Sequence, residues 1–394
     1  MCFHGIFDGV IHYIPLALAS GWLVVPLVTL WRARHSPSLD DERAIAPEGA
    51  PSVSIVIPAR NEERNIERCV RSALASAYPD LQVVAIDDHS TDATGSILRE
   101  IAGEDARLRV MVPDPLPSGW FGKQWACRAG VSASAGEIIG FMDADTSQSP
   151  ELVTRVVNWM RSHDADLVTV AGDQELGSFW EKLIQPQVFS VLFMRYGGPG
   201  AVNRSKSKES KIANGQCIFV RRDAYESLGG HDAVRDKVAE DLALAQLWFE
   251  RGKRSFLVEG VPHLSTRMYT SLAEINKGWG KNIYAGGRES WPGGRFMQAL
   301  YPMALLSPGL GYLMPVAMAL LGYFGVVGTG WYVWGAAASL CSLLWWSLVY
   351  AAMSESPLYA LLYPVGAAAL LCISIGSIVR GRRVSWKDRR YVVT

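Results

Sequence analysis

The chain has 394 residues, of which 49% are hydrophobic and 19% are charged, and its 38 basic side chains balance 38 acidic ones. This length suits two or three structural units. A soluble protein carries about 25% charged residues, so part of this chain is poor in charge. The balanced charge argues against a protein that binds nucleic acid by neutralising phosphates. Six scattered cysteines without a C-x-x-C motif favour neither disulfides nor a zinc site.

The N-terminal end is the first stretch without charge, since residues 9–31 contain no Asp, Glu, Lys or Arg. A helix that crosses a bilayer needs roughly 20 apolar residues, so we predict a membrane span near residues 10–31. The run lacks a basic start and continues beyond a possible cleavage site, which favours an uncleaved anchor. Arg32 and Arg34 follow directly. The positive-inside rule therefore places the next segment in the cytoplasm, at a bacterial inner membrane.

Short apolar runs alternate with helical stretches in the charged central part of the chain. Strands are expected at residues 53–58, 82–86, 108–112, 138–142 and 167–171. Helices are expected at residues 65–77, 93–101, 122–134, 150–163 and 242–251. The fourth helix has Ser149 as its expected cap and Pro150 at its first position. This alternation predicts an α/β fold with a mostly parallel twisted sheet and flanking helices.

Polar residues stand at the ends of three of these strands. They are Arg60 and Glu62, which follow Pro58 at the first strand, then Asp87 and Asp88, then Asp143 and Asp145. Ligands of such sheets bind beyond the carboxyl ends of the strands, so we expect a ligand site there. Taken singly, Asp92 could cap a helix and Asn61 could shape a turn. Neither a dinucleotide fold nor a P-loop is supported, because both glycine motifs are absent.

Asp143 and Asp145 stand one residue apart at the end of the fourth strand. Alternate carboxylates in this position can hold Mg²⁺ or Mn²⁺, which are hard cations that prefer oxygen ligands and bind substrate phosphates. The cation would stabilise the negative charge on a leaving diphosphate. The alternative is a solvated acidic turn.

Two long stretches without charge follow, at residues 296–354 and 356–379. A buried core helix rarely runs so long without a polar face, so we predict three further membrane spans. They lie near residues 299–326, 331–353 and 358–379.

The basic tail at residues 380–394 conflicts with three spans, because an odd number would leave it on the face opposite the central part. One of the three segments is therefore expected to be interfacial or re-entrant. The first segment is our candidate, because it contains Pro302, Pro308 and Pro315.

Three central segments resemble glycosyltransferases of family 2, which are inverting enzymes with a GT-A fold. The segments read SIVIPARNEERNIERCVRSALASAYPDLQVVAIDDHSTDAT, FMDADT and NGQCIFVRRDAYESLGGHDAVRDKVAEDLALA. Flanking stretches are similar to a membrane-bound subgroup of carotenoid-type, hopanoid-associated and ceramide glycosyltransferases. These stretches are GWFGKQWACRAG, GWGKN and the tail SWKDRRY.

The resemblance implies roles for individual residues. It implies nucleotide-sugar contacts from Pro58, Arg60, Glu62, Asp87, Asp88, Lys123, Asp143 and Trp279, and metal ligation by Asp145 and Asp143. Asp241, beside Glu240, would be the general base, because an acceptor hydroxyl loses its proton as it attacks the anomeric carbon. Both acids could also simply favour the start of a helix. The Gln and Arg of the relatives' Q-x-x-R-W motif are absent around Trp279, so Lys277 or Lys281 is the expected cation.

These features predict an inverting glycosyltransferase that moves a sugar from a nucleotide-diphosphate sugar to a membrane lipid acceptor, with Mg²⁺ or Mn²⁺ and without nucleic acid. The alternatives are a polyprenyl-phosphate sugar transferase, which shares the motifs, and a non-catalytic membrane scaffold. The predicted parts are an anchor (1–31), a linker (32–51), a GT-A catalytic domain (52–270), an interfacial segment (271–298), a membrane region (299–379) and a basic tail (380–394).

Overall fold

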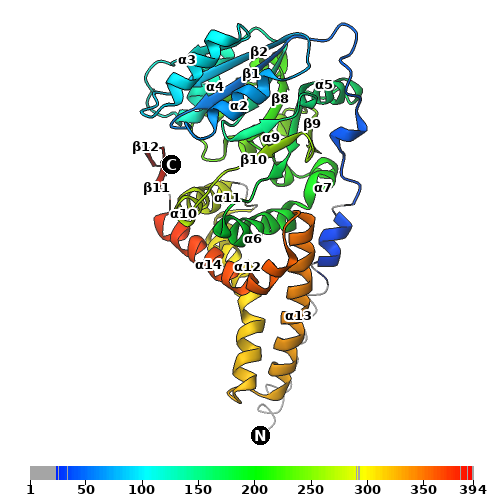
Figure 1. Ribbon diagram of the computed structural model, residues 1–394. Helices are drawn as coiled ribbons and strands as arrows, with labels where there is room; N and C mark the ends of the chain where they lie inside the picture. The colour runs from blue at the N-terminus through cyan, green and yellow to red at the C-terminus, as the bar shows by residue number, and fades with distance from the viewer. Residues whose placement is uncertain are drawn as a thin grey trace.

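The computed structural model of the chain shows a layered domain above a group of long helices (Figure 1). It describes residues 24, 26–32, 34–289, 291, 293–381, 383–387 and 389–392. Most of the predicted N-terminal anchor, residues 1–31, lies outside the described residues.

A seven-stranded sheet forms the centre of the domain, in the order β3-β2-β1-β4-β8-β6-β9. Pairing is parallel throughout, except that β8 runs antiparallel to both β4 and β6. The mostly parallel sheet and all five predicted strands are confirmed. The strands are β1 (Val53–Ala59), β2 (Leu81–Asp87), β3 (Leu108–Met111), β4 (Ile138–Met142), β6 (Leu167–Ala171), β8 (Cys217–Arg221) and β9 (Ser255–Glu259).

Helices cover both faces of this sheet. Successive residues of a strand point to opposite sides, so each strand contributes side chains to the core on both faces. Ile55 and Ile57 of β1 pack in the core of one face, and Val56 between them packs in the core of the other. The first face is covered by α2 (Ile66–Leu74), α3 (Thr94–Glu104) and α5 (Leu152–Ser162), and the second by α4 (Gly122–Ser132), α8 (Arg222–Ser227) and α9 (Glu240–Glu250).

The start of α5 differs from the prediction, because the helix begins at Leu152 and Ser149 does not cap it. The Ser149 hydroxyl lies instead 3.0 Å from His263 Nδ1, in a hydrogen bond to a residue 114 positions later. Ser149 therefore contacts a residue that is distant in the sequence instead of capping the helix.

Smaller elements join the sheet to the long helices. A second sheet of three short strands has the order β5-β10-β7. Its strands are β5 (Thr146–Gln148), β7 (Asp173–Gln174) and β10 (Leu264–Thr266). The connecting helices are α6 (Phe179–Tyr196), α7 (Gly198–Arg204), α10 (Leu272–Lys281) and α11 (Gly287–Glu289).

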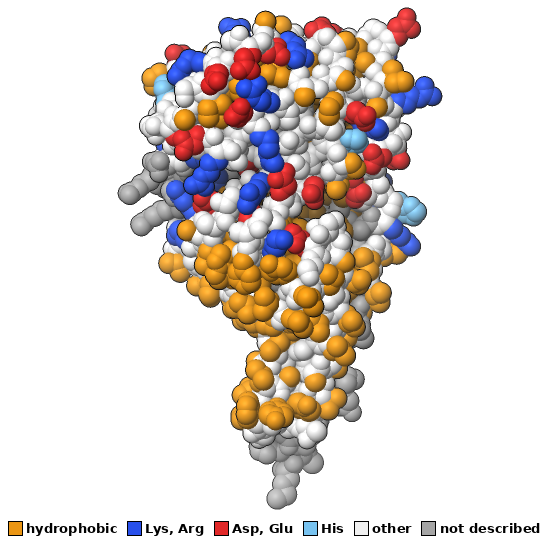
Figure 2. Space-filling view, viewed as in Figure 1, with side chains coloured by type: hydrophobic (Ala, Val, Ile, Leu, Met, Phe, Trp, Pro, Cys, Tyr) orange, Lys and Arg blue, Asp and Glu red, His pale blue; other side chains and the backbone are white. Residues whose placement is uncertain are grey.

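Three long apolar helices follow, α12 (Arg295–Tyr323), α13 (Thr329–Ala352) and α14 (Tyr363–Arg380), the last preceded by the turn η5 (Pro357–Leu362). By length and composition, each of these three segments could cross a membrane. Figure 2 shows hydrophobic side chains gathered around this end of the molecule, whereas acidic and basic side chains are spread over the sheet domain. The predicted C-terminal membrane region is therefore present as three apolar helices.

α12 runs unbroken through its three prolines, so the prolines do not break this segment as expected. Proline is tolerated in a membrane helix where neighbouring helices support the backbone that it disturbs. α12 packs along α13 and also against α14. Figure 1 shows α12 and α13 side by side as a hairpin that protrudes from the molecule.

α14 has a different position, because it lies obliquely beneath the domain and packs against α6, α10 and α12 (Figure 1). One of its faces is buried, with Ala367 and Ile373 almost fully covered. The opposite face exposes apolar side chains, among them Val365, Ile375 and Val379.

The tail after α14 returns to the sheet domain. Its strands β11 (Arg383–Trp386) and β12 (Arg389–Val392) form an antiparallel hairpin. The Tyr391 ring stacks on Phe121, which directly precedes α4, with 4.2 Å between ring centroids. The tail and the sheet domain therefore lie together at the same end of the α12–α13 hairpin.

Candidate active site

The carboxyl edge of the main sheet gathers the acidic residues of the predicted site. β4 ends directly before Asp143, in a turn where the Thr146 hydroxyl donates to the Asp143 carbonyl at 2.7 Å. Because β8 runs the opposite way, the residues before it lie beside this turn, and the Asp143 N–H donates to the Gln216 carbonyl at 3.1 Å. α9 begins at the same edge with Glu240 and Asp241.

Lys123, in the first turn of α4, lies between two carboxylates. Its Nζ is 2.7 Å from Asp143 Oδ1 and 2.8 Å from Glu240 Oε1. Burial opposes the charge of Lys123, but the two carboxylates outweigh it and raise the pKa of Lys123 well above its usual value. Burial likewise favours the neutral form of Glu240, but Lys123 outweighs it and lowers the pKa of Glu240. The three side chains thus form a fixed, charged cluster.

The Asp241 carboxylate is oriented by two backbone groups. The Gly215 N–H donates to Oδ2 at 3.0 Å, and the Leu242 N–H donates to Oδ1 at 2.7 Å. A Cβ at Gly215 would lie 2.7 Å from Asp241 Oδ2, so this close approach requires glycine. Burial, followed by repulsion from Glu240, raises the pKa of Asp241 to about 6. A carboxylate with this pKa is suited to accept a proton near neutral pH.

Asp145 presents an oxygen that is ready for a ligand, because its buried Oδ1 has no hydrogen-bond partner among the described residues. Burial, together with the charge of Asp143, raises the pKa of Asp145 well above its usual value. A buried acidic oxygen without a partner is costly, and a bound cation removes that cost. No group of three His, Cys, Asp or Glu that could hold a metal is found in the described part of the chain. The two carboxylates therefore fit a cation whose remaining ligands are substrate phosphates and water.

One cavity of about 1830 Å³ joins this charged edge to the apolar helices. Its charged end is lined by Glu62, Lys123, Asp145, Glu240 and Asp241. Its other end is formed by α6, α12 and α13, which contribute Phe189, Phe193, Leu305, Tyr312, Trp345 and Leu348. A ligand with a polar head and an apolar chain could occupy both ends at once.

α10 contributes Trp279 to the wall of this cavity. The indole ring packs edge to face on Phe189 with 5.7 Å between ring centroids, and its buried N–H has no hydrogen-bond partner among the described residues. Lys277 and Lys281 line the same cavity. Both lysines proposed from the sequence as replacements for the missing arginine are therefore in reach of a bound ligand.

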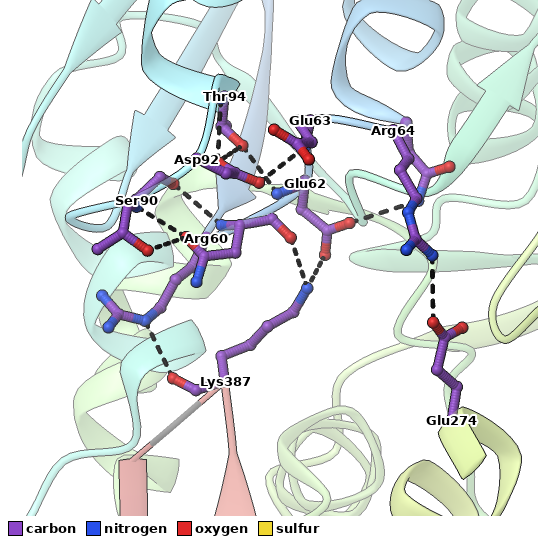
Figure 3. Close-up of polar contacts among 12 residues, drawn as sticks. Arg60, Glu62, Glu63, Arg64, Ser90, Asp92, Thr94, Glu274 and Lys387 are labelled. Atoms are coloured by element: carbon purple, nitrogen blue, oxygen red, sulfur yellow. Dashed lines mark hydrogen bonds and ion pairs between the residues drawn. The ribbon is translucent and has the colours of Figure 1, made fainter.

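The loops after β1 and β2 hold each other by hydrogen bonds (Figure 3). The Asn61 N–H donates to Ser90 Oγ at 3.0 Å, and the Glu62 N–H donates to Thr94 Oγ1 at 2.8 Å. Asn61 has a φ of 52°, in the left-handed region that asparagine tolerates. The Thr94 N–H donates to Asp92 Oδ1 at 3.0 Å, at the start of α3. Asn61 thus has the turn role considered as an alternative, whereas Asp92 precedes Ala93, the N-cap of α3, and bonds to the first residue of that helix.

Five predicted nucleotide contacts come from these loops, and they divide into two groups. Pro58 and Glu62 line the cavity, whereas Arg60, Asp87 and Asp88 are not among its lining residues. The structure therefore brings only the first two together with the carboxylates of β4 and α9.

The second group is engaged elsewhere. Arg60 donates from Nη1 to the Asp88 carbonyl at 2.5 Å, and Asp87 Oδ1 accepts from the Ser90 N–H at 3.0 Å. The Asp88 carboxylate forms a two-point ion pair with Arg389 of the tail. These side chains shape the rim of the site and connect it to the tail.

Sequence reasoning missed several residues of the cavity wall, namely Asn214, Gly215, Gln216, Tyr269 and Lys387. The segment NGQC was part of the family resemblance, and it could have indicated a glycine in close contact with a carboxylate. The tail motif SWKDRRY was also noticed, but no local pattern in the sequence indicates that the tail contacts residues more than 300 positions earlier.

The geometry agrees with comparisons to known proteins. Residues 54–229 match the model of the family described as glycosyl transferase family 2. The chain carries a glycosyl transferase family 2 domain. This domain makes the chain an enzyme of the glycosyltransferase class.

Related sequences are named 4,4'-diaponeurosporenoate glycosyltransferase. The protein from Staphylococcus haemolyticus is 26% identical over 70% of this chain and 71% of its own length. The protein from Staphylococcus aureus is 26% identical over 60% of this chain and 61% of its own length.

A solved structure with a similar fold is a mannosyltransferase from Pyrobaculum calidifontis in complex with GDP-Man and Mn²⁺. It has a TM-score of 0.58 and 19% sequence identity, and the match covers 94% of this chain and 98% of that one. At this identity the likeness shows the fold, and it confirms the predicted GT-A fold with its apolar helices.

Proposed function

We propose that the chain is an inverting glycosyltransferase that transfers a sugar from a nucleotide-diphosphate sugar to the polar head of a membrane lipid. The observation that carries this proposal is one continuous cavity, which is lined by the Asp241 carboxylate at one end and by apolar helices at the other. The names of the curated relatives support a lipid of the carotenoid type. Hopanoid and sphingoid lipids are the other acceptors considered, since each also joins a polar head to an apolar body.

The reaction is a single displacement. Asp241 accepts the proton of an acceptor hydroxyl while the acceptor oxygen forms a bond to the anomeric carbon of the sugar. The bond between that carbon and the diphosphate oxygen breaks, and the nucleoside diphosphate leaves with the bonding electron pair. The backbone N–H groups of Gly215 and Leu242 keep the Asp241 carboxylate in one orientation throughout. One base and one displacement invert the anomeric centre.

Asp145 and Asp143 are the residues that would hold Mg²⁺ or Mn²⁺ together with the donor diphosphate, and the Mn²⁺ in the related mannosyltransferase supports this class of ion. When bound, such a cation stabilises the charge that develops on the leaving diphosphate. Lys123 holds Asp143 at 2.7 Å and thereby limits the repulsion between the two carboxylates.

The cavity walls also indicate how the acceptor would bind. An apolar lipid tail would lie between α6, α12 and α13, which spares it the cost of entering water. The α12–α13 hairpin would cross the membrane twice and return the chain to its starting side. With α14 at the membrane boundary, the basic tail and the sheet domain would both face the cytoplasm, as the positive-inside rule requires.

The test is a transfer assay with membranes that contain the full chain, a panel of radiolabelled nucleotide sugars, and extraction of labelled lipids. We expect label in a lipid for at least one donor, and no label with Asp241→Asn. A matched control is Asp232→Asn, because Asp232 is 53% exposed and pairs with Arg128 on another surface. Label in polyprenyl phosphate would favour the phosphate acceptor, and absence of transfer with every donor and lipid would contradict the proposal.

A further inference from the structure

The C-terminal hairpin is docked on the loop after β1, at the charged end of the cavity. Lys387, in the turn of the hairpin, places Nζ 2.9 Å from Glu62 Oε1 and donates to the Asn61 carbonyl at 2.9 Å. The Lys387 carbonyl in turn accepts from Arg60 Nε at 3.2 Å (Figure 3). The Lys387 side chain lines the cavity and is 28% exposed. A residue from the end of the chain thus belongs to the wall of the site.

Arg389 anchors this hairpin through a buried ion pair. Its two Nη atoms lie 2.5 and 2.9 Å from the two carboxylate oxygens of Asp88, in the fork geometry that arginine prefers. The Asp88 side chain is 2% exposed and that of Arg389 is 18% exposed. The Tyr391 ring stacks on Phe121, and its oxygen accepts from the Gly122 N–H at 3.3 Å. The hairpin is therefore fixed through its turn and through β12.

The balance of charge around the cavity explains why a cation is needed there. The carboxylates that line its charged end include those of Glu62, Asp143, Asp145, Glu240 and Asp241, and Lys277 and Lys281 line the cavity as well. Lys123 is already shared between two of these carboxylates. A diphosphate brings further negative charge, so it binds only where additional cations face it.

We propose that the hairpin is a permanent wall of the donor site and that Lys387 is a donor-binding residue for the diphosphate of a nucleoside diphosphate sugar. This inference rests on the proposed function. Lys387 lies beside the loop after β1, and Lys123 lies beside Asp143 at the end of β4. A lysine ammonium acts here as a compact point charge with three donors, of which Glu62 and the Asn61 carbonyl engage two.

Asp88 has a different role in this arrangement from a direct nucleotide contact. Its carboxylate is almost fully buried under Arg389, so it acts on the donor through the hairpin as a positioning residue. A wall also accounts for the structure better than a plug, because displacing the hairpin would break the Asp88–Arg389 ion pair and separate Tyr391 from Phe121. The cavity meanwhile remains open beside Lys387.

The experiment measures binding of UDP and of GDP, each with Mn²⁺, to the purified full chain in detergent by calorimetry. We expect Lys387→Met to weaken binding of the preferred nucleotide about tenfold, since a hydrogen bond to a charged group is lost. Lys387→Arg should restore most of the affinity. The matched control is Lys253→Met, which removes a partly exposed lysine just before β9, at the opposite edge of the sheet.

A second measurement tests the anchor. Arg389→Met, Asp88→Asn and the double variant should all weaken nucleotide binding by the same factor, because either change releases the same hairpin. In the transfer assay these changes should raise KM for the donor and leave kcat nearly unchanged.

Unchanged binding by Lys387→Met would overturn the inference, and tighter binding would overturn it and also identify the hairpin as a plug. Failure of the unaltered chain to bind either nucleotide would instead contradict the proposed function, and the inference with it. Lys387 is partly exposed, so its variants are expected to fold, and an unchanged unfolding midpoint verifies this.

Discussion

At the scale of single residues, the site depends on how burial distributes charge among its carboxylates. Glu240 and Asp241 are neighbours in the sequence, yet their pKa values move in opposite directions. Lys123 contacts Glu240 directly and keeps it ionised, whereas burial, followed by repulsion from Glu240, raises the pKa of Asp241. The first acid is thus suited to remain a fixed charge and the second to accept a proton near neutral pH.

The first prediction concerns Asp241→Asn. The amide keeps the shape of the side chain but cannot accept the proton of a hydroxyl, so kcat should fall about 10²- to 10⁴-fold. Donor affinity should change little. Initial rates and nucleotide binding measured in parallel check this. A lipid carboxylate acceptor needs no base, so a loss of less than about tenfold would indicate that acceptor class.

The second prediction concerns pH. Asp241 accepts a proton only in its ionised form, and burial beside Glu240 raises its pKa to about 6. The ratio kcat/KM should therefore be constant above this pH and fall as the pH drops through about 6. A rate profile over about pH 5 to 8 measures this limb. A profile that is flat across the same range would remove Asp241 from the role of base.

At the scale of elements, the contact between α14 and α6 joins the apolar helices to the domain. Gly366 permits this contact, because a Cβ there would lie 2.7 Å from the Leu183 carbonyl oxygen and 2.9 Å from Gln187 Nε2. Two helices that touch through a glycine approach closely. The tail follows α14 directly, so the position of α14 also determines where the hairpin docks.

The third prediction follows from this contact. Gly366→Leu should push α14 away from α6 and destabilise the chain by about 1 to 3 kcal/mol, the usual range for overpacking. A thermal unfolding curve in detergent measures the change. Gly330→Leu is the matched control, because a Cβ at Gly330 in α13 meets nothing within 4 Å. Equal unfolding midpoints for the two variants would contradict the packing argument.

Elements with strong local signals could be predicted from the sequence. β4 and β6 have the predicted bounds, because each is a short apolar run with almost every residue buried. The start of α5 could not be predicted, because the hydroxyl of Ser149 bonds to His263. The unbroken course of α12 through its prolines depends on neighbouring helices, which the local pattern does not contain.

The candidate site could be predicted in part for the same reason. Asp143, Asp145 and Asp241 stand in recognisable motifs, and the sheet topology brings them to one edge. The Lys123 cluster and the Asp88–Arg389 pair join distant parts of the chain, so neither is visible in any local segment.

At the scale of the whole molecule, the distribution of side chains separates a polar domain from an apolar base (Figure 2). Many of the exposed apolar residues lie on α12, α13 and α14, among them Phe296, Met303, Tyr323, Val333, Leu344 and Val379. Exposing so much apolar surface to water would be unfavourable, so a bilayer is the expected surrounding for this end.

The fourth prediction concerns topology. A reporter fused to the C-terminus should be found on the same side of the membrane as the sheet domain, because Arg389 pairs with Asp88. A reporter inserted at Gly325, in the turn between α12 and α13, should be found on the opposite side. Fluorescent-protein and phosphatase fusions distinguish the two sides. Opposite sides for the C-terminus and the domain would require α14 to cross the membrane.

The continuity of the cavity also affects how the enzyme meets its acceptor. Because the apolar end is formed by the same helices that would sit in the bilayer, a lipid could reach the base by lateral diffusion within its leaflet. The relevant acceptor concentration is then a mole fraction in the membrane plane rather than an amount per volume. Adding inert lipid while the amount of acceptor stays constant should therefore slow the reaction, although the amount of acceptor per volume of sample hardly changes.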